Sequence, residues 1–130
     1  MTAHLRDFRR PRLWLSLWCV AILAVIALSL IPPPPMTVPR GFDKVEHLVG
    51  YLLLSAGAVL LFASRSAQLK AGLGLVALGI ALEIAQALLT QTRAAEPADA
   101  LANAAGVVIG LLLAYSPLAR GLVWVDRRLP

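Results

Sequence analysis

The chain has 130 residues, of which 59% are hydrophobic and only 15% are charged. Soluble domains carry about 45–50% apolar and about 25% charged residues, so a soluble core of this size would leave much apolar surface in water. The formal net charge is +5, but the basic residues stand in short clusters without interleaved aromatic residues, which argues against nucleic acid as a partner. The single cysteine, Cys19, excludes an internal disulfide. Composition therefore predicts a single membrane domain over residues 1–130.

Four apolar stretches follow one another along the chain. Each is close to the roughly 20 residues that a helix needs to cross the hydrocarbon core of a bilayer. Helices are expected because every backbone polar group in lipid must be paired within its own segment. Pro32–Pro35 cannot continue a helix, and polar turns are expected at 64–70 and 90–98. The predicted fold is an all-α, four-helix transmembrane bundle, with helices at about 13–31, 45–63, 71–89 and 100–117.

The basic residues are distributed unevenly between the two sides of this bundle. Nine lie before the first helix, in the 64–70 turn or in the tail, whereas three lie in the other two linkers. The positive-inside rule therefore places the N- and C-termini in the cytoplasm. A cleaved signal peptide is the alternative for the first stretch, but its apolar run is longer than the usual 7–15 residues of a signal. Cleavage would leave the orientation of the other helices unchanged.

The second predicted helix opens with several polar residues. Asp43, His47 and Tyr51 are spaced i, i+4, i+8, so they share one face, and Lys44 lies beside that face. Glu46 points about 100° away from His47, so we expect it at headgroup level or in solvent. Histidine is the residue type whose protonation changes near neutral pH, so His47 is a candidate general acid or base.

Polar residues also mark the outer ends of the third and fourth predicted helices. Glu83 and Gln86 lie three residues apart, Arg93 falls in the following turn, and Asp99 and Asn103 share a face of the fourth helix. With the predicted orientation, all of them occupy the outer third of the bilayer. A charged group near the middle of a membrane helix costs about 2.5–3.5 kcal/mol, so such groups find partners or a function. Pairing among these residues without any ligand is the alternative interpretation.

Small residues form a separate stripe on the fourth helix. Ala102, Gly106, Gly110 and Ala114 recur at a spacing of four, which is typical of a surface where another helix approaches closely. We interpret this stripe as a packing surface rather than a binding site. No His-Glu-x-x-His or other diagnostic metal spacing is present, so no metal or cofactor is predicted, although His47, Glu83 and Asp99 make a metal site conceivable.

The polar residues beyond the first helix form an ordered set of motifs. They are Asp43-Lys44-x-x-His47-x-x-x-Tyr51, Glu83-x-x-Gln86, and Arg93 followed by Asp99-x-x-x-Asn103-x-x-Gly106-x-x-x-Gly110. This set resembles the VanZ-like family of bacterial membrane proteins. Two departures concern Leu48, where an aromatic residue is expected, and Gln91-Thr92, which replaces a Pro-Gly-like approach to Arg93. The second departure affects the geometry of that turn.

The resemblance implies a multi-pass protein of the bacterial inner (cytoplasmic) membrane, with a role in the cell envelope linked to tolerance of the glycopeptide teicoplanin. We expect an anionic membrane lipid or lipid-linked precursor as partner, bound at the extracytoplasmic side. In this hypothesis His47, Glu83 and Asp99 position the head group or move protons, and Arg93 and Lys44 hold its phosphate. Three further binding residues orient the others: Tyr51, Gln86 and Asn103. Asp43 is also predicted to belong to the binding site.

Three other hypotheses remain open. The first is an enzyme, a transferase or hydrolase of a lipid-linked substrate. The second is a structural or assembly module, whose polar cluster only fastens the helices and whose partner is a second copy or another membrane protein. The third is a proton-coupled carrier, which is disfavoured because the predicted polar residues lie on one side and offer no polar path to the cytoplasm.

Overall fold

A computed structural model describes residues 4–31, 39, 41–90 and 96–130. The regular secondary structure of the described residues is helical, apart from one isolated bridge between Leu5 and Phe62. Four helices are long and apolar enough to cross a membrane, the fourth when its 3-10 continuation to Tyr115 is included. The elements are α1 (Pro11–Leu30), α2 (Phe42–Leu61), α3 (Arg65–Leu89), α4 (Pro97–Leu112), the 3-10 turns η1 (Leu113–Tyr115) and η2 (Pro117–Arg120), and α5 (Gly121–Arg128).

The predicted turn at 64–70 is wrong, because α3 already begins at Arg65. Ser64 caps this helix by accepting a hydrogen bond from the backbone N–H of Ala67 at 3.2 Å. The polarity of this segment suggested a turn, but most of its polar residues are good helix formers, so the backbone is helical there. The second helix likewise starts earlier than expected, at Phe42, and α5 was not predicted at all.

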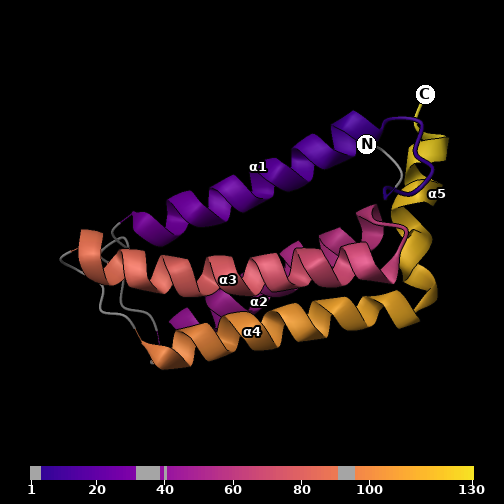
Figure 1. Cartoon of the computed structure of the whole chain (residues 1–130). Helices are drawn as coiled ribbons and strands as arrows, with labels where there is room; N and C mark the ends of the chain where they lie inside the picture. The colour runs from indigo at the N-terminus through magenta and orange to yellow at the C-terminus, as the bar shows by residue number, and fades with distance from the viewer. Residues whose placement is uncertain (1–3, 32–38, 40, 91–95) are drawn as a thin grey trace.

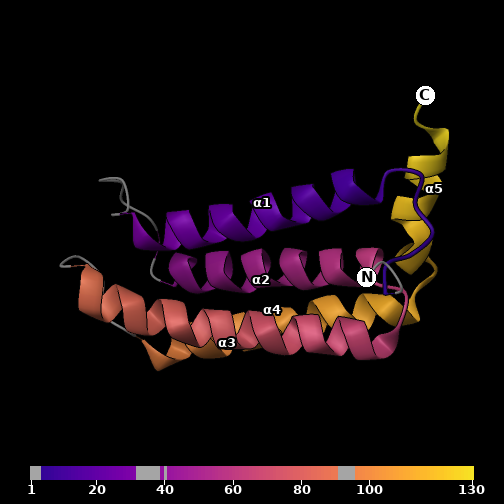
Figure 2. The ribbon, with the colours of Figure 1, turned by 45° about the horizontal axis from the view of Figure 1, so that its top comes forward.

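The bundle has two ends, at which different helix termini meet (Figure 1). One end carries the start of α2, the end of α3 and the start of α4, and the opposite end carries both termini and α5. The helices α2 and α4 share the most extensive contact, and α3 packs against both of them. In the view of Figure 2, α1 lies beside α2 and contributes no buried residue. The large apolar side chains of α1 that remain exposed are typical of a lipid-facing helix.

The contact between α2 and α4 depends on two glycines. A Cβ atom placed on Gly106 would lie 2.2 Å from the carbonyl oxygen of Leu48. One placed on Gly110 would lie 1.9 Å from the hydroxyl oxygen of Ser55 and 2.4 Å from the carbonyl oxygen of Leu52. These distances leave no room for a side chain, so the two backbones pack directly against each other. Ala102, the first residue of the predicted stripe, is partly buried on the same helix.

A small apolar core lies between the helices. It consists of Tyr51, Leu54, Leu75 and Val107, and Ile22 and Val25 of α1 pack against its edge. The core therefore joins α2, α3 and α4 tightly, whereas α1 is attached at the side. Trp18 adds one anchor for α1, because its indole N–H donates to the carbonyl oxygen of Leu54 at 2.8 Å.

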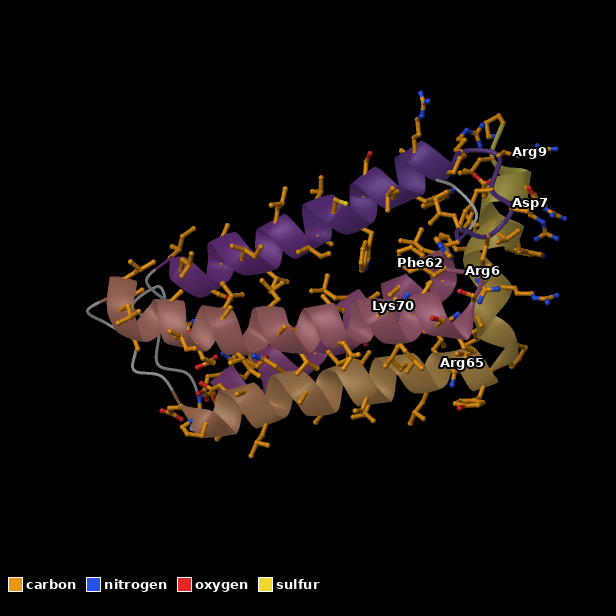
Figure 3. The ribbon with its side chains drawn as sticks, viewed as in Figure 1. Arg6, Asp7, Arg9, Phe62, Arg65 and Lys70 are labelled. Carbon is orange, nitrogen blue, oxygen red and sulfur yellow. The ribbon has the colours of Figure 1, made fainter. Side chains whose placement is uncertain are left out.

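The N-terminal segment runs along the end of α2. The backbone N–H of Arg6 donates to the carbonyl of Leu61 at 2.9 Å, and the N–H of Ala63 donates to the carbonyl of His4 at 2.8 Å. The first bond satisfies one of the carbonyl groups that the C-terminal end of a helix otherwise leaves unpaired, and the second continues the pairing just beyond α2. Charged side chains crowd this end of the bundle, where Figure 3 labels Arg6, Asp7, Arg9 and Arg65.

Asp126 on α5 fastens the two ends of the chain together. Its buried carboxylate accepts hydrogen bonds from the Trp14 indole N–H, at 2.8 Å, and from the backbone N–H of Arg9. Burial alone would raise the pKa of Asp126, but these hydrogen bonds and the charge of Arg10 outweigh it and hold the pKa below its ordinary value. The carboxylate is thus kept ionised, and α5 is tied to the start of α1.

Candidate functional site

Three ionisable side chains from three different helices meet at the end of the bundle opposite the termini. His47 of α2, Glu83 of α3 and Asp99 of α4 each offer a ligand atom, and these atoms all lie within 4.8 Å of one another. Nδ1 of His47 lies 3.8 Å from Oε1 of Glu83, and Nε2 lies 3.9 Å from Oδ2 of Asp99. Glu83 is only 5% exposed and Asp99 only 7% exposed. The structure therefore brings the three predicted catalytic residues together.

The helix boundaries explain why these residues lie at one depth. His47 is the sixth residue of α2, Glu83 lies six residues before the end of α3, and Asp99 is the third residue of α4. Each is within about two turns of the same end, or about 9 Å at 1.5 Å per residue. Asp99 also lies in the first turn of its helix, where the free backbone N–H groups favour a negative charge.

Asn103 orients the imidazole of His47. Its side-chain oxygen lies 3.0 Å from Nδ1, and in the tautomer with the proton on Nδ1 the imidazole donates to it. In that tautomer the lone pair of Nε2 is available on the side where Oδ2 of Asp99 lies, 3.9 Å away. This distance is too long for a direct hydrogen bond, but a cation between the two atoms could bind both.

Lys44 is surrounded by carboxylates. Its ammonium lies 2.8 Å from Glu96, 3.0 Å from Asp43 and 3.2 Å from Asp99. These contacts satisfy the charge of Lys44, so a phosphate would have to displace a carboxylate to bind there. Arg93, the other predicted phosphate ligand, lies outside the described residues. Sequence reasoning missed Glu96 as a member of the cluster, although its position just before α4 indicates proximity to Asp99.

Three buried polar atoms of the site have no hydrogen-bond partner in the described part of the chain. They are the hydroxyl of Tyr51, which is 2% exposed, Oε1 of Glu83, and Oδ1 of Asp99, which lies in ion-pair contact with Lys44. The other oxygen of Glu83 accepts a hydrogen bond of 3.4 Å from the backbone N–H of Glu96. Buried polar atoms are nearly always paired, so the Tyr51 hydroxyl and Oε1 of Glu83 are the atoms of the site with capacity for a further bond.

The remaining predicted binding residues are placed differently. The amide of Gln86 donates to the carbonyl of Ser29 on α1 at 2.8 Å, so its hydrogen bond links two helices rather than orienting the cluster. Asp43 is at the rim, paired with Lys44. Glu46 is exposed, in contrast to the largely buried His47.

The cluster has the composition of a cation site. One imidazole nitrogen and two carboxylates are common ligands of zinc and of other divalent metals. Asn103 would act from outside the ligand set by holding the imidazole in a fixed tautomer, as is usual around a ligating histidine. The same groups can also pass a proton between His47 and a neighbouring carboxylate. Comparison of the chain with protein-family models, with curated proteins and with solved structures finds no match.

Proposed function

We propose that this chain is a multi-pass protein of the bacterial inner membrane, similar to the VanZ-like family, that binds or modifies the head group of an anionic lipid or lipid-linked envelope precursor. The observation that carries the proposal is the convergence of His47, Glu83 and Asp99 at one end of the bundle. The excess of basic residues at the opposite end favours an extracytoplasmic location for this site. A lipid head group in the outer leaflet would then lie at its level.

The charges at the site determine how an anionic group can bind. Among the described residues the cluster holds four carboxylates but only the one ammonium of Lys44. A phosphate would be repelled by this excess of negative charge. A divalent cation held by His47, Glu83 and Asp99 removes the conflict, because its free coordination positions attract phosphate oxygens. We therefore include the cation in the proposal, in place of the metal-free site predicted from sequence.

The chemistry open to the bound head group follows from the same residues. The cation would polarise a phosphate or carbonyl oxygen, and a carboxylate oxygen of Asp99 or Glu83 that does not ligate it would take a proton from an attacking hydroxyl. The unpaired Tyr51 hydroxyl supplies a donor or an acceptor at the buried side of the site. A transferase or hydrolase is the reaction class that these groups suit best.

A structural module is the second candidate. It is favoured by the hydrogen bonds and ion pairs that cross between helices, such as His47 with Asn103 and Lys44 with Asp99. In this case the cluster is internally paired and takes neither a cation nor a lipid. The unpaired oxygen of Glu83 and the unpaired hydroxyl of Tyr51 weigh against it.

Metal and lipid content test the proposal directly. We expect the protein purified in mild detergent to retain one divalent cation per chain, measured by elemental mass spectrometry, and a phosphate-bearing lipid that leaves on treatment with EDTA. Glu83→Gln should weaken retention of added Zn²⁺ or Mn²⁺ by at least tenfold, since loss of a charged ligand costs no less than loss of a residue that supports one. Glu46→Gln is the matched control and should bind normally, because Glu46 is exposed. Equal metal retention in wild type and Glu83→Gln would favour the structural module.

A further inference from the structure

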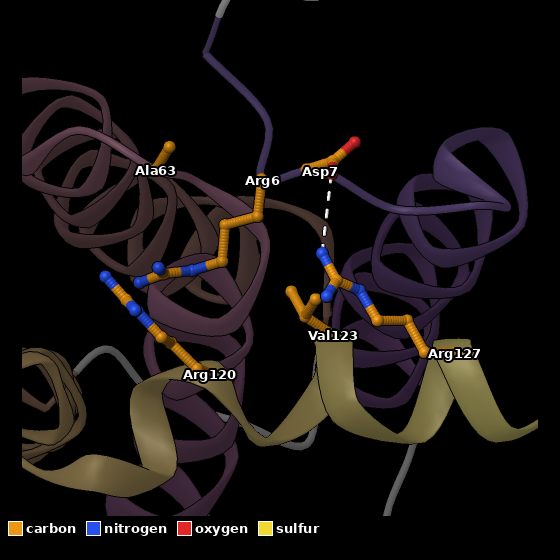
Figure 4. Close-up of a pocket in the computed structure, with 6 residues that line it drawn as sticks. All are labelled: Arg6, Asp7, Ala63, Arg120, Val123 and Arg127. Atoms are coloured by element: carbon orange, nitrogen blue, oxygen red, sulfur yellow. Dashed lines mark hydrogen bonds and ion pairs between the residues drawn. The ribbon is translucent and has the colours of Figure 1, made fainter.

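A cavity lies at the other end of the bundle, beside the termini. It has a volume of about 270 Å³ and lies between the N-terminal segment, the end of α2 and the helix α5. Figure 4 shows the residues that line it: Arg6, Asp7, Ala63, Arg120, Val123 and Arg127. Three of these six side chains are arginines, so the cavity is strongly basic.

Arg6 is held in a fixed position by its hydrogen bonds. Nε and one terminal nitrogen of its guanidinium donate to the carbonyl oxygen of Val59, at 3.2 and 3.1 Å. Its backbone N–H donates to Leu61 at 2.9 Å. The side chain is therefore preorganised, and its remaining N–H groups are available to another acceptor.

Arg6 and Arg120 face each other without a carboxylate between them. Figure 4 shows the two guanidinium groups pointing toward one another. Burial and the neighbouring charge of Arg120 hold the pKa of Arg6 below its ordinary value. Asp7, the one acid that lines the cavity, lies 3.4 Å from Arg127 instead and is 96% exposed. Within the described residues, the repulsion between Arg6 and Arg120 is thus not neutralised.

The position of the cavity matches the headgroup level of a membrane. It adjoins the ends of helices that can cross the bilayer. Trp124 on the adjacent α5 is 57% exposed, and the guanidinium carbon of Arg128 lies 3.4 Å from the centre of its ring. Exposed tryptophan and arginine are typical of the boundary between lipid and water.

We propose that the cavity between Arg6, Arg120 and Arg127 binds a phosphate group, supplied by an anionic phospholipid of the leaflet at this end of the bundle. Guanidinium groups form paired hydrogen bonds to phosphate oxygens, and two facing guanidiniums can each use one pair. This site lies at the opposite end from His47, Glu83 and Asp99, so it does not depend on the function proposed for them. Inorganic phosphate is the other source of the same ligand chemistry.

Arg120→Gln is the variant that tests the site. Arg120 is exposed and makes no hydrogen bond or ion pair within the described chain, so its loss should leave the fold intact. Arg12→Gln is the matched control, because Arg12 is an exposed arginine at the start of α1 that does not line the cavity. Both variants remove one positive charge from the same end of the bundle.

The measurement is native mass spectrometry of the EDTA-treated protein, titrated with phosphatidylglycerol or phosphatidylcholine. Wild type and Arg12→Gln should bind one phosphatidylglycerol in preference to phosphatidylcholine. Arg120→Gln should bind it roughly tenfold more weakly, as expected for the loss of charge-assisted hydrogen bonds. Inorganic phosphate is the second probe. If it raises the melting temperature of wild type but not of Arg120→Gln, and wild type shows no preference for phosphatidylglycerol over phosphatidylcholine, the site exists and its ligand is free phosphate. The proposal would be overturned if Arg120→Gln and Arg12→Gln bound phosphatidylglycerol equally well and also bound inorganic phosphate equally well.

Discussion

Replacing Gly106 or Gly110 with alanine should destabilise the bundle by about 1–3 kcal/mol each, the range expected when a well-packed contact is overfilled. A single methyl group at Gly106 would lie 2.2 Å from a backbone oxygen of α2, and one at Gly110 would lie 2.4 Å from another. Backbone atoms cannot move aside as a flexible side chain can, so the two helices must separate. Leucine at either position should prevent assembly of the bundle. Thermal unfolding in detergent measures the effect.

Two other glycines serve as controls for this experiment. Nothing lies within 4 Å of a Cβ atom built on Gly74 of α3 or on Gly50 of α2. Alanine at these positions should be neutral or should stabilise the helix by about 0.5–1 kcal/mol, because alanine has the higher helix propensity. A normal melting temperature for Gly106→Ala and Gly110→Ala would show that α2 and α4 do not approach as closely as described.

Glu83→Gln should abolish activity while the protein still folds. The substitution removes the charge but keeps a side-chain oxygen that can accept the hydrogen bond from the Glu96 backbone. Among the described residues, the nearest basic group to the Glu83 carboxylate is the imidazole of His47, 3.8 Å away and beyond hydrogen-bond distance, so the melting temperature should change little. His47→Ala should also be folded and inactive, because it removes the imidazole from the same cluster.

The assay for these variants follows from the family resemblance. Tolerance of the host to teicoplanin, or to another envelope stress, would be compared with and without expression of each variant. Glu46→Gln is the control and should behave almost as wild type, because its side chain is exposed. Full activity of both Glu83→Gln and His47→Ala would leave the structural module as the better interpretation. Failure of Glu46→Gln alone would show that the wrong face of α2 has been assigned to the site.

The membrane spans and the gathering of the catalytic candidates could be predicted from the sequence. Long apolar runs determine where helices can cross a bilayer, and the rise per residue determines the depth of each polar side chain. The sequence alone therefore predicted His47, Glu83 and Asp99 at the same depth in the bilayer. Their closeness also needs α2, α3 and α4 to turn the right faces inward, and the glycine stripe of α4 made that arrangement plausible.

Other features depend on contacts that periodicity does not encode. Lys44 was expected to be available for phosphate, but it is paired with Glu96 and Asp99, which lie at the start of α4 and are distant from it in sequence. Gln86 lies three residues from Glu83, which rotates it by about 60° around the helix, and this is enough to direct its hydrogen bond to α1. The short helix α5 has no long apolar run, so its attachment through Asp126 was not predicted.

The proposed extracytoplasmic location of the His47 cluster is tested most directly by labelling single cysteines. With Cys19 changed to serine, a cysteine would replace either Ala98, which is exposed beside Asp99, or Ser66, which is exposed at the opposite end. We expect a membrane-impermeant maleimide to label Ala98→Cys in intact spheroplasts and to label Ser66→Cys only after permeabilisation. Labelling of Ser66→Cys but not Ala98→Cys in intact spheroplasts would place the cluster in the cytoplasm and contradict an outer-leaflet site.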